Sequence, residues 1–125
     1  MNGVLLDTDI IIEVLRRRDA AILLRWTALG MSETPVYYTP VTAAELWQGM
    51  RPREEEQVLR LLGAMTCIPL THDMGRIAGT YMQRYGRSHG VDLPDAMIAA
   101  TSVLHGCALW TRNRKHYPMP DIELF

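Results

Sequence analysis

Short, continuously apolar runs alternate with longer amphipathic stretches along the chain. Residues 4–7, 36–39, 67–70 and 108–111 form such runs, which are typical of strands covered on both faces of a sheet. Residues 122–125 are a candidate for a short final strand. Apolar residues with helical spacing predict six helices between these strands, at 8–18, 19–29, 42–50, 52–65, 72–87 and 94–105.

Strands that alternate with helices predict an α/β fold. We expect a three-layer α/β/α sandwich around a mainly parallel sheet of four to five strands. The 125 residues suffice for one domain with a substantial core, so residues 1–125 are interpreted as a single domain. Ligands of such sheets bind at the carboxyl ends of the strands, which directs attention to the residues that follow each strand.

Composition narrows the class of protein. The formal net charge is −1, and 48% of the residues are hydrophobic, as in an ordinary globular domain. Cys67 and Cys107 lie in apolar segments, so we expect both to be buried thiols rather than a disulfide. The four histidines lack the paired spacing of a zinc site, and no apolar run is long enough to span a membrane. These features favour a cytoplasmic protein.

Five acidic residues lie at the borders of apolar elements, where loss of hydration makes a charge costly. They are Asp7, Asp9, Glu45, Asp92 and Asp95. A shared cation is one explanation, and carboxylate oxygens suit the hard ions Mg²⁺ and Mn²⁺.

Helix capping is the other explanation for each acid. Asp7 can cap the helix at 8–18, and Asp9 can interact with the dipole in its first turn. Glu45 follows Thr42 with the spacing of a capping box. Asp92 and Asp95 flank a proline suited to the first position of a helix.

The acids are more informative together than singly. Parallel α/β topology brings helix N-termini to one edge of the sheet, so the carboxylates of several helices converge there. Three or more converging carboxylates repel one another unless a cation lies between them. The pattern therefore favours a divalent metal site.

Four segments resemble, in order and spacing, the motifs of PIN-domain ribonucleases. They read VLLDTDIIIEVL, VTAAELWQG, DAMIAATSVLHG and LWTRNRKHY, and together they extend over almost the whole chain. The small single-domain form is similar to the VapC toxins of bacterial toxin–antitoxin pairs. The resemblance implies an endoribonuclease in which a metal-activated water attacks the RNA phosphodiester.

The resemblance also implies roles for individual residues. Asp7, Glu45 and Asp95 match the catalytic acids, Asn113 matches a fourth position that holds Asp or Asn, and Asp7 and Asp95 are the implied ligands of Mg²⁺ or Mn²⁺. The supporting or weaker candidates are Thr8, Asp9, Asp92 and Thr111. His116 stands where relatives often carry Asp before an aromatic residue, and its role is open, as is the number of metal ions.

Partners follow from the same resemblance. Twelve of the thirteen bases are arginines, which suit phosphate recognition, although a bias in codon usage explains the excess equally well. Arg112, Arg114 and Lys115 follow the last core strand and are candidates to bind RNA, or form a solvated loop. A VapB-like antitoxin that inserts a cation among the acids is implied, and a homodimer is common in such proteins. Trp26, Leu59 and Leu62 can contribute to a dimer interface or to the core.

Two other functions compete with the nuclease. Asp7-Thr8-Asp9 after an apolar strand mimics the DxD signature of haloacid-dehalogenase-like phosphatases, with Asp7 as the nucleophile. The only lysine, Lys115, comes too late in the chain for the lysine motif of that class. A non-catalytic PIN-like binding domain is the second alternative, and the retained acids argue against it.

Overall fold

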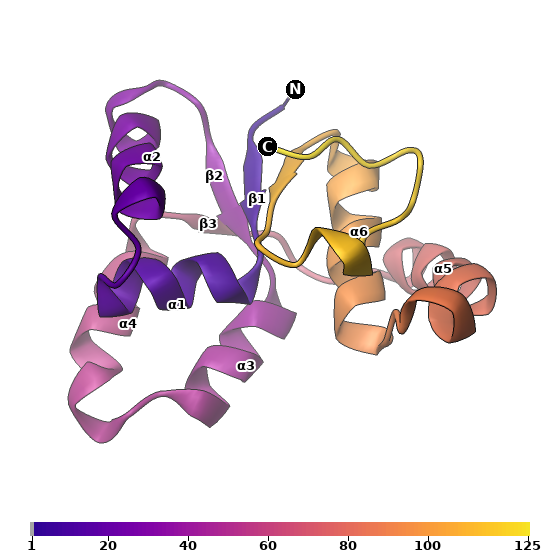
Figure 1. The fold of residues 1–125 in the computed structure, drawn as a ribbon, viewed down its shortest axis with the longest axis horizontal. Helices are drawn as coiled ribbons and strands as arrows, with labels where there is room; N and C mark the ends of the chain where they lie inside the picture. Colours follow the sequence, from indigo (N-terminus) through magenta and orange to yellow (C-terminus); the bar gives the residue numbers. More distant parts are fainter. Residues whose placement is uncertain (1) are drawn as a thin grey trace.

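A four-stranded parallel sheet forms the centre of the molecule in the computed structural model, which describes residues 2–125 (Figure 1). The strands are β1 (Val4–Leu6), β2 (Val36–Tyr38), β3 (Thr66–Cys67) and β4 (Ala108–Trp110). Their order is β3-β2-β1-β4, and every pairing is parallel. The predicted parallel α/β sheet is therefore confirmed. The candidate fifth strand contributes only one bridge, between Leu109 and Leu124.

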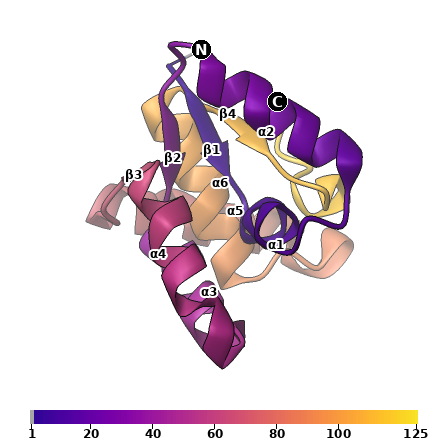
Figure 2. The same cartoon turned by 90° about the vertical axis from the view of Figure 1, so that its left-hand side faces the viewer.

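Helices cover both faces of this sheet. They are α1 (Thr8–Arg16), α2 (Ala20–Met31), α3 (Pro40–Gly49), α4 (Glu55–Gly63), α5 (His72–His89) and α6 (Leu93–His105), with 3-10 turns η1 (Pro52–Glu54) and η2 (Arg114–His116). Figures 1 and 2 show α1, α2 and α4 on one side of the sheet and α5 and α6 on the other. Because side chains alternate along a strand, Leu5 packs in the α5–α6 core, whereas Val4 and Leu6 pack in the other core. The result is the predicted three-layer sandwich.

Several predicted boundaries differ from the observed ones. The helix predicted at 19–29 begins at Ala20 and continues to Met31, and Ser32 caps it. The third strand begins at Thr66 and ends at Cys67, rather than at Leu70. Cys67 is exposed because β3 is a two-residue strand at the edge of the sheet, so the prediction of a buried thiol was wrong for Cys67 and right for Cys107.

The candidate interface side chains divide between core and surface. Trp26 and Leu62 pack in the α1–α2–α4 core, whereas Leu59 is exposed.

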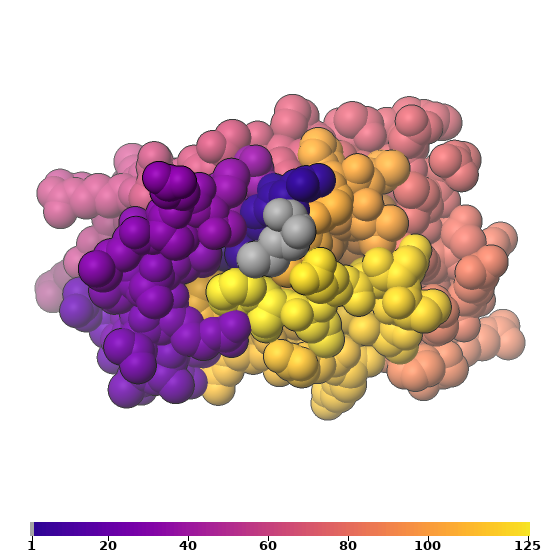
Figure 3. All heavy atoms as spheres, turned by 90° about the horizontal axis from the view of Figure 1, so that it is seen from above, coloured from indigo at the N-terminus to yellow at the C-terminus, as the bar shows by residue number. Residues whose placement is uncertain are grey.

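The C-terminal residues lie against α2, where the guanidinium of Arg25 stacks over the ring of Phe125 (Figure 3). Within residues 2–125 no helix combines the length and apolarity needed to cross a membrane.

Candidate active site

Asp7 is the buried centre of a hydrogen-bond cluster at the carboxyl edge of the sheet. It directly follows β1 and is 8% exposed. The amide of Thr8 donates to its Oδ1 at 2.8 Å, so Asp7 is the N-cap of α1, as the capping explanation predicted. Its Oδ2 accepts from the hydroxyls of Thr111 at 2.8 Å and Tyr117 at 3.0 Å. These bonds satisfy a charge that would otherwise be costly to bury.

Glu45 joins the cluster from α3. The hydroxyl of Thr8 donates to its Oε1 at 2.7 Å and lies 3.1 Å from the hydroxyl of Thr42. The predicted capping box of Thr42 and Glu45 was wrong, because α3 begins at Pro40 and Thr39 is its N-cap. Glu45 lies in the middle of α3, so no helix terminus accounts for its charge.

Asp95 reaches the same region from the first turn of α6. Its Oδ1 lies 3.4 Å from the hydroxyl of Tyr117, and its Oδ2 lies 3.2 Å from Nδ1 of His116. Burial, followed by the negative charge of Asp92, raises the pKa of Asp95 to about 7. The carboxyl group is therefore poorly stabilised as an anion in the protein alone.

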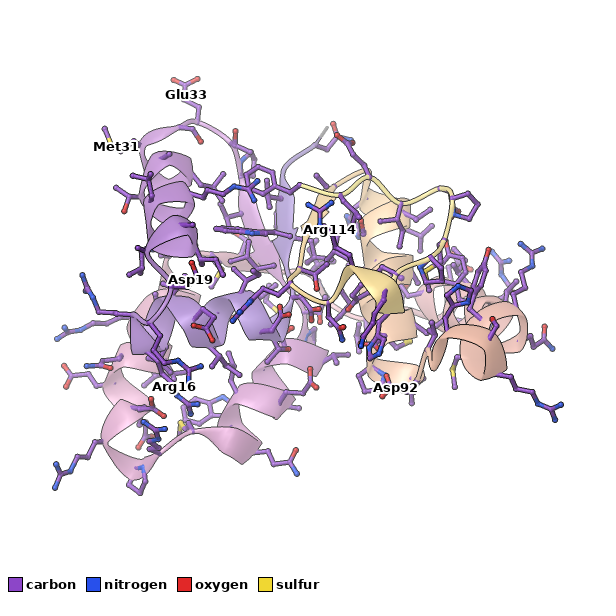
Figure 4. All side chains as sticks on the ribbon, viewed as in Figure 1. Arg16, Asp19, Met31, Glu33, Asp92 and Arg114 are labelled. Atoms are coloured by element: carbon purple, nitrogen blue, oxygen red, sulfur yellow. The ribbon has the colours of Figure 1, made fainter. Side chains whose placement is uncertain are left out.

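Asp92 serves mainly to begin the helix. Its Oδ1 accepts from the amide of Asp95 at 3.2 Å, which makes it the N-cap of α6. Its side chain does not line the acidic pocket described below, and Figure 4 shows it at the start of α6. For Asp92 the capping explanation holds.

Asp9 has a buried carboxylate oxygen that no hydrogen-bond donor of residues 2–125 reaches. Its Oδ2 accepts from the amide of Arg112 at 3.1 Å, but its Oδ1 is buried without a hydrogen bond. Burial and the charge of Asp7 raise the pKa of Asp9 to about 6. A buried carboxylate oxygen without a donor is a position where a cation is stabilised.

A single pocket of about 260 Å³ collects these groups. It is lined by Asp7, Thr8, Asp9, Ile12, Glu45, Asp95 and Asn113. Four of the five acids thus converge at the predicted edge of the sheet, although Asp92 does not line the pocket and Glu45 comes from the middle of α3 rather than from a helix N-terminus. Within residues 2–125 no three acidic, histidine or cysteine side chains are already arranged around one point as a metal site. Threonine hydroxyls engage Asp7 and Glu45 instead. The hard oxygen donors and the unpartnered Asp9 oxygen nevertheless fit Mg²⁺ or Mn²⁺.

The segment after β4 closes one side of the pocket. Thr111 is buried, and its Oγ1 accepts from the amide of Asn113 at 3.0 Å while donating to Asp7. Asn113 Nδ2 lies 2.7 Å from Nδ1 of His116, the same ring nitrogen that faces Asp95. Residue 116, for which the sequence suggested no role, therefore connects this segment to α6.

The three basic residues of this segment have different surroundings. Nη1 of Arg112 is 2.9 Å from Oε1 of Glu13, a buried acid that also pairs with Arg18 at 2.6 Å. Arg114 donates to the main-chain oxygen of Phe125 at 3.4 Å, and Lys115 is exposed. Their binding to RNA stays a prediction.

Sequence reasoning missed two buried residues that contact the site or the segment beside it, Tyr117 and Glu13. Tyr117 is 4% exposed, and its hydroxyl lies between two candidate ligands. Its burial and the charges of Asp7 and Asp95 raise the pKa of the phenol, so it remains a hydrogen-bond donor. Only the alternation of apolar residues in its segment hinted that its ring is buried. Glu13 stands in the apolar helix motif as an isolated acid, which was a usable signal.

The sequence and the fold of the chain were compared with those of known proteins, and both comparisons indicate the same family. The sequence profile of the PIN domain matches residues 4–121. Ribonuclease VapC10 of Mycobacterium tuberculosis is 38% identical over 117 residues, covering 93% of this chain and 86% of the relative. Ribonuclease VapC19 of the same species is 33% identical over 121 residues, covering 95% and 96%. A chain in a toxin–antitoxin complex from Klebsiella pneumoniae is 27% identical, with a TM-score of 0.75 and coverage of 96% and 95%.

The fold and the matched residues define a PIN-domain protein, and the chain belongs to that family. Within the family it belongs with the VapC ribonucleases, which confirms the resemblance seen in its four motifs. A haloacid-dehalogenase-like phosphatase is thereby excluded, because the match extends over the DxD-like segment and the rest of the site.

Proposed function

We propose that the chain is a metal-dependent endoribonuclease and the toxin of a toxin–antitoxin pair. The observation that carries the proposal is the convergence of Asp7, Asp9, Glu45 and Asp95 on one pocket in a chain whose relatives are VapC ribonucleases. A non-catalytic domain would have no need to keep four mutually repelling carboxylates at one pocket.

Asp7 and Asp95 are the residues that we expect to hold Mg²⁺ or Mn²⁺, with Asp9 and Glu45 beside them. When bound, such an ion lowers the pKa of an attacking water and offsets the charge that develops on the scissile phosphate. Thr8 holds Glu45 in place, since its hydroxyl donates to Oε1 at 2.7 Å. Thr111 and Asn113 order the segment after β4, from which Arg114 and Lys115 extend toward solvent to hold the RNA backbone. In-line attack leaves 5′-phosphate and 3′-hydroxyl ends.

The activity is tested by incubating the purified protein with total cellular RNA in Mn²⁺ or Mg²⁺. We expect cleavage with 5′-phosphate ends that is abolished by EDTA and by Asp7→Asn. Glu33→Gln is the matched control, because Glu33 is an exposed acid at the far end of the molecule from Asp92 (Figure 4). Cleavage that persists in EDTA, or that Glu33→Gln also abolishes, would contradict the proposal.

We further propose a small VapB-like antitoxin as partner, and a homodimer as the assembly. The Klebsiella pneumoniae relative is part of a toxin–antitoxin complex. The acidic pocket suits a cationic side chain of an inhibitory peptide, because an arginine would satisfy the same carboxylate oxygens as the metal. An antitoxin segment that inserts such a side chain should compete with Mn²⁺, and its Arg→Ala variant should not. Size-exclusion chromatography with light scattering tests the homodimer.

A further inference from the structure

Three segments of the chain meet at a single oxygen atom. The hydroxyl of Tyr117 donates to Oδ2 of Asp7 at 3.0 Å and lies 3.4 Å from Oδ1 of Asp95. Asp7 follows β1, Asp95 belongs to the first turn of α6, and Tyr117 comes after η2. Among the hydroxyls of residues 2–125, that of Tyr117 alone forms hydrogen bonds with both carboxylates.

The ring of Tyr117 is anchored away from solvent. It packs in the core formed with α5 and α6, and the residue is 4% exposed. A buried ring has few alternative rotamers, so its hydroxyl is held where it is. Tyr117 does not line the acidic pocket, and therefore acts on the carboxylates from behind.

The hydrogen bonds to Asp7 also distinguish its two oxygens. A carboxylate has about four acceptor positions, two on each oxygen. Tyr117 and Thr111 take both positions on Oδ2, and the amide of Thr8 takes one on Oδ1. Oδ1 is thus the oxygen of Asp7 that keeps a free acceptor position for a cation.

We infer that Tyr117 is a positioning residue that orients Asp7 and Asp95 as a pair, so that Asp7 presents Oδ1 alone to the divalent ion. This inference rests on the proposed metal-dependent function. Hydrogen-bond partners of metal ligands typically contribute 10- to 100-fold to metal affinity or activity. The phenol supplies this effect without adding a charge to a pocket that already holds four carboxylates.

The substitution Tyr117→Phe removes only the hydroxyl and keeps the buried ring. Tyr81→Phe is its matched control, because Tyr81 is 5% exposed and donates to Oδ2 of Asp121 at 2.9 Å, outside the pocket. Each variant loses one buried phenol donor, which Asp7 and Asp95 share in one case and Asp121 accepts in the other, so urea denaturation should show comparable losses of stability. Only Tyr117→Phe should change the metal site.

The experiment measures Mn²⁺ affinity by the EPR signal of the free ion, for the wild type, both tyrosine variants and Asp7→Asn. We expect Tyr117→Phe to weaken Mn²⁺ binding about 10- to 100-fold, and Tyr81→Phe to leave it within about twofold. Turnover of RNA by Tyr117→Phe should recover at high Mn²⁺, and the KM for RNA should not change, because the phenol does not reach the pocket surface.

Three outcomes separate this inference from the proposed function. Unchanged or tighter Mn²⁺ binding by Tyr117→Phe, with Asp7→Asn still defective, would overturn the positioning role and leave the metal site standing. A wild-type protein that binds no Mn²⁺ would overturn both. If Tyr117→Phe does not fold, Thr111→Val removes the other donor to Oδ2, and normal Mn²⁺ affinity in that variant would overturn the claim that the donors on Oδ2 leave Oδ1 alone for the ion.

Discussion

Oε1 of Glu13 lies 2.9 Å from Nη1 of Arg112, and this contact ties the middle of α1 to the segment that follows β4. The same oxygen is 2.6 Å from Nη2 of Arg18 just beyond the end of α1. Glu13 is 6% exposed, whereas the two arginine side chains are half exposed. Glu13 is therefore a buried acid that forms ion pairs with two arginines from solvent-facing segments. The backbone amide of Arg112 also donates to Oδ2 of Asp9.

Glu13→Gln should destabilise the protein by about 1–2 kcal/mol, because it weakens two charge-assisted contacts of a buried group. Glu56→Gln is the matched control, since the Glu56–Arg60 pair is also 2.6 Å long but both side chains are exposed. We expect the control to change the free energy of unfolding by less than about 0.5 kcal/mol. Urea denaturation measures both, and equal losses would show that burial of Glu13 contributes nothing.

The parallel sheet was predictable because buried strands carry a strong signal. The apolar runs that became β1 and β4 are covered on both faces, so nearly every residue in them is apolar. β3 was harder to place, since it is a two-residue edge strand whose residues are exposed. The start of α3 was misplaced because Thr39 and Thr42 can both act as caps, and the choice depends on where β2 ends.

The acids that line the pocket were predictable as a group because a charge at the border of an apolar element is costly and conspicuous. The sequence could not decide between helix capping and metal binding. In the structure Asp7 caps α1 and also lines the acidic pocket, so the two explanations are compatible. The hydrogen bond from Tyr117 to Asp7 joins residues 110 positions apart, and no local sequence pattern predicts such a contact. Long-range hydrogen bonds of this kind are set by packing.

Without metal, stability should fall as pH rises from about 4 to about 7. The folded-state pKa values of Asp9 and Asp95 are about 6 and about 7, above the ordinary value of 3.8. The folded state therefore binds more protons than the unfolded state in this window, and linkage makes stability decrease as pH rises through it. Thermal unfolding in EDTA at a series of pH values measures the effect.

Mn²⁺ should reverse this loss by neutralising the ionised carboxylates, so it should raise the Tm much more at about pH 8 than at about pH 5. The Asp9→Asn/Asp95→Asn double variant is the control, and its Tm in EDTA should depend less on pH in this window. Equal stabilisation by Mn²⁺ at both pH values would contradict the expected role of the two acids.

Glu45→Gln should reduce RNA cleavage about 100-fold or more while leaving the fold intact, since losing one preorganised electrostatic group at a reacting centre has effects of this size. The residue is exposed on α3, and glutamine can still accept from the hydroxyl of Thr8. Initial rates measured with Glu33→Gln as the control test this. Cleavage by Glu45→Gln at the wild-type rate would remove Glu45 from the site.

Lys115→Ala should weaken RNA binding without affecting the metal site. Lys115 is exposed next to the pocket segment, so its ammonium group is available to a phosphate. RNA affinity is best measured in an Asp7→Asn background, where the substrate stays intact, over a range of salt concentrations. Losing one phosphate contact should make the slope of log affinity against log salt shallower by about 0.7. Arg84→Ala on α5 is the control, because α5 contributes no residue to the pocket. If Arg84→Ala weakens binding as much as Lys115→Ala does, RNA does not approach the site along the segment after β4.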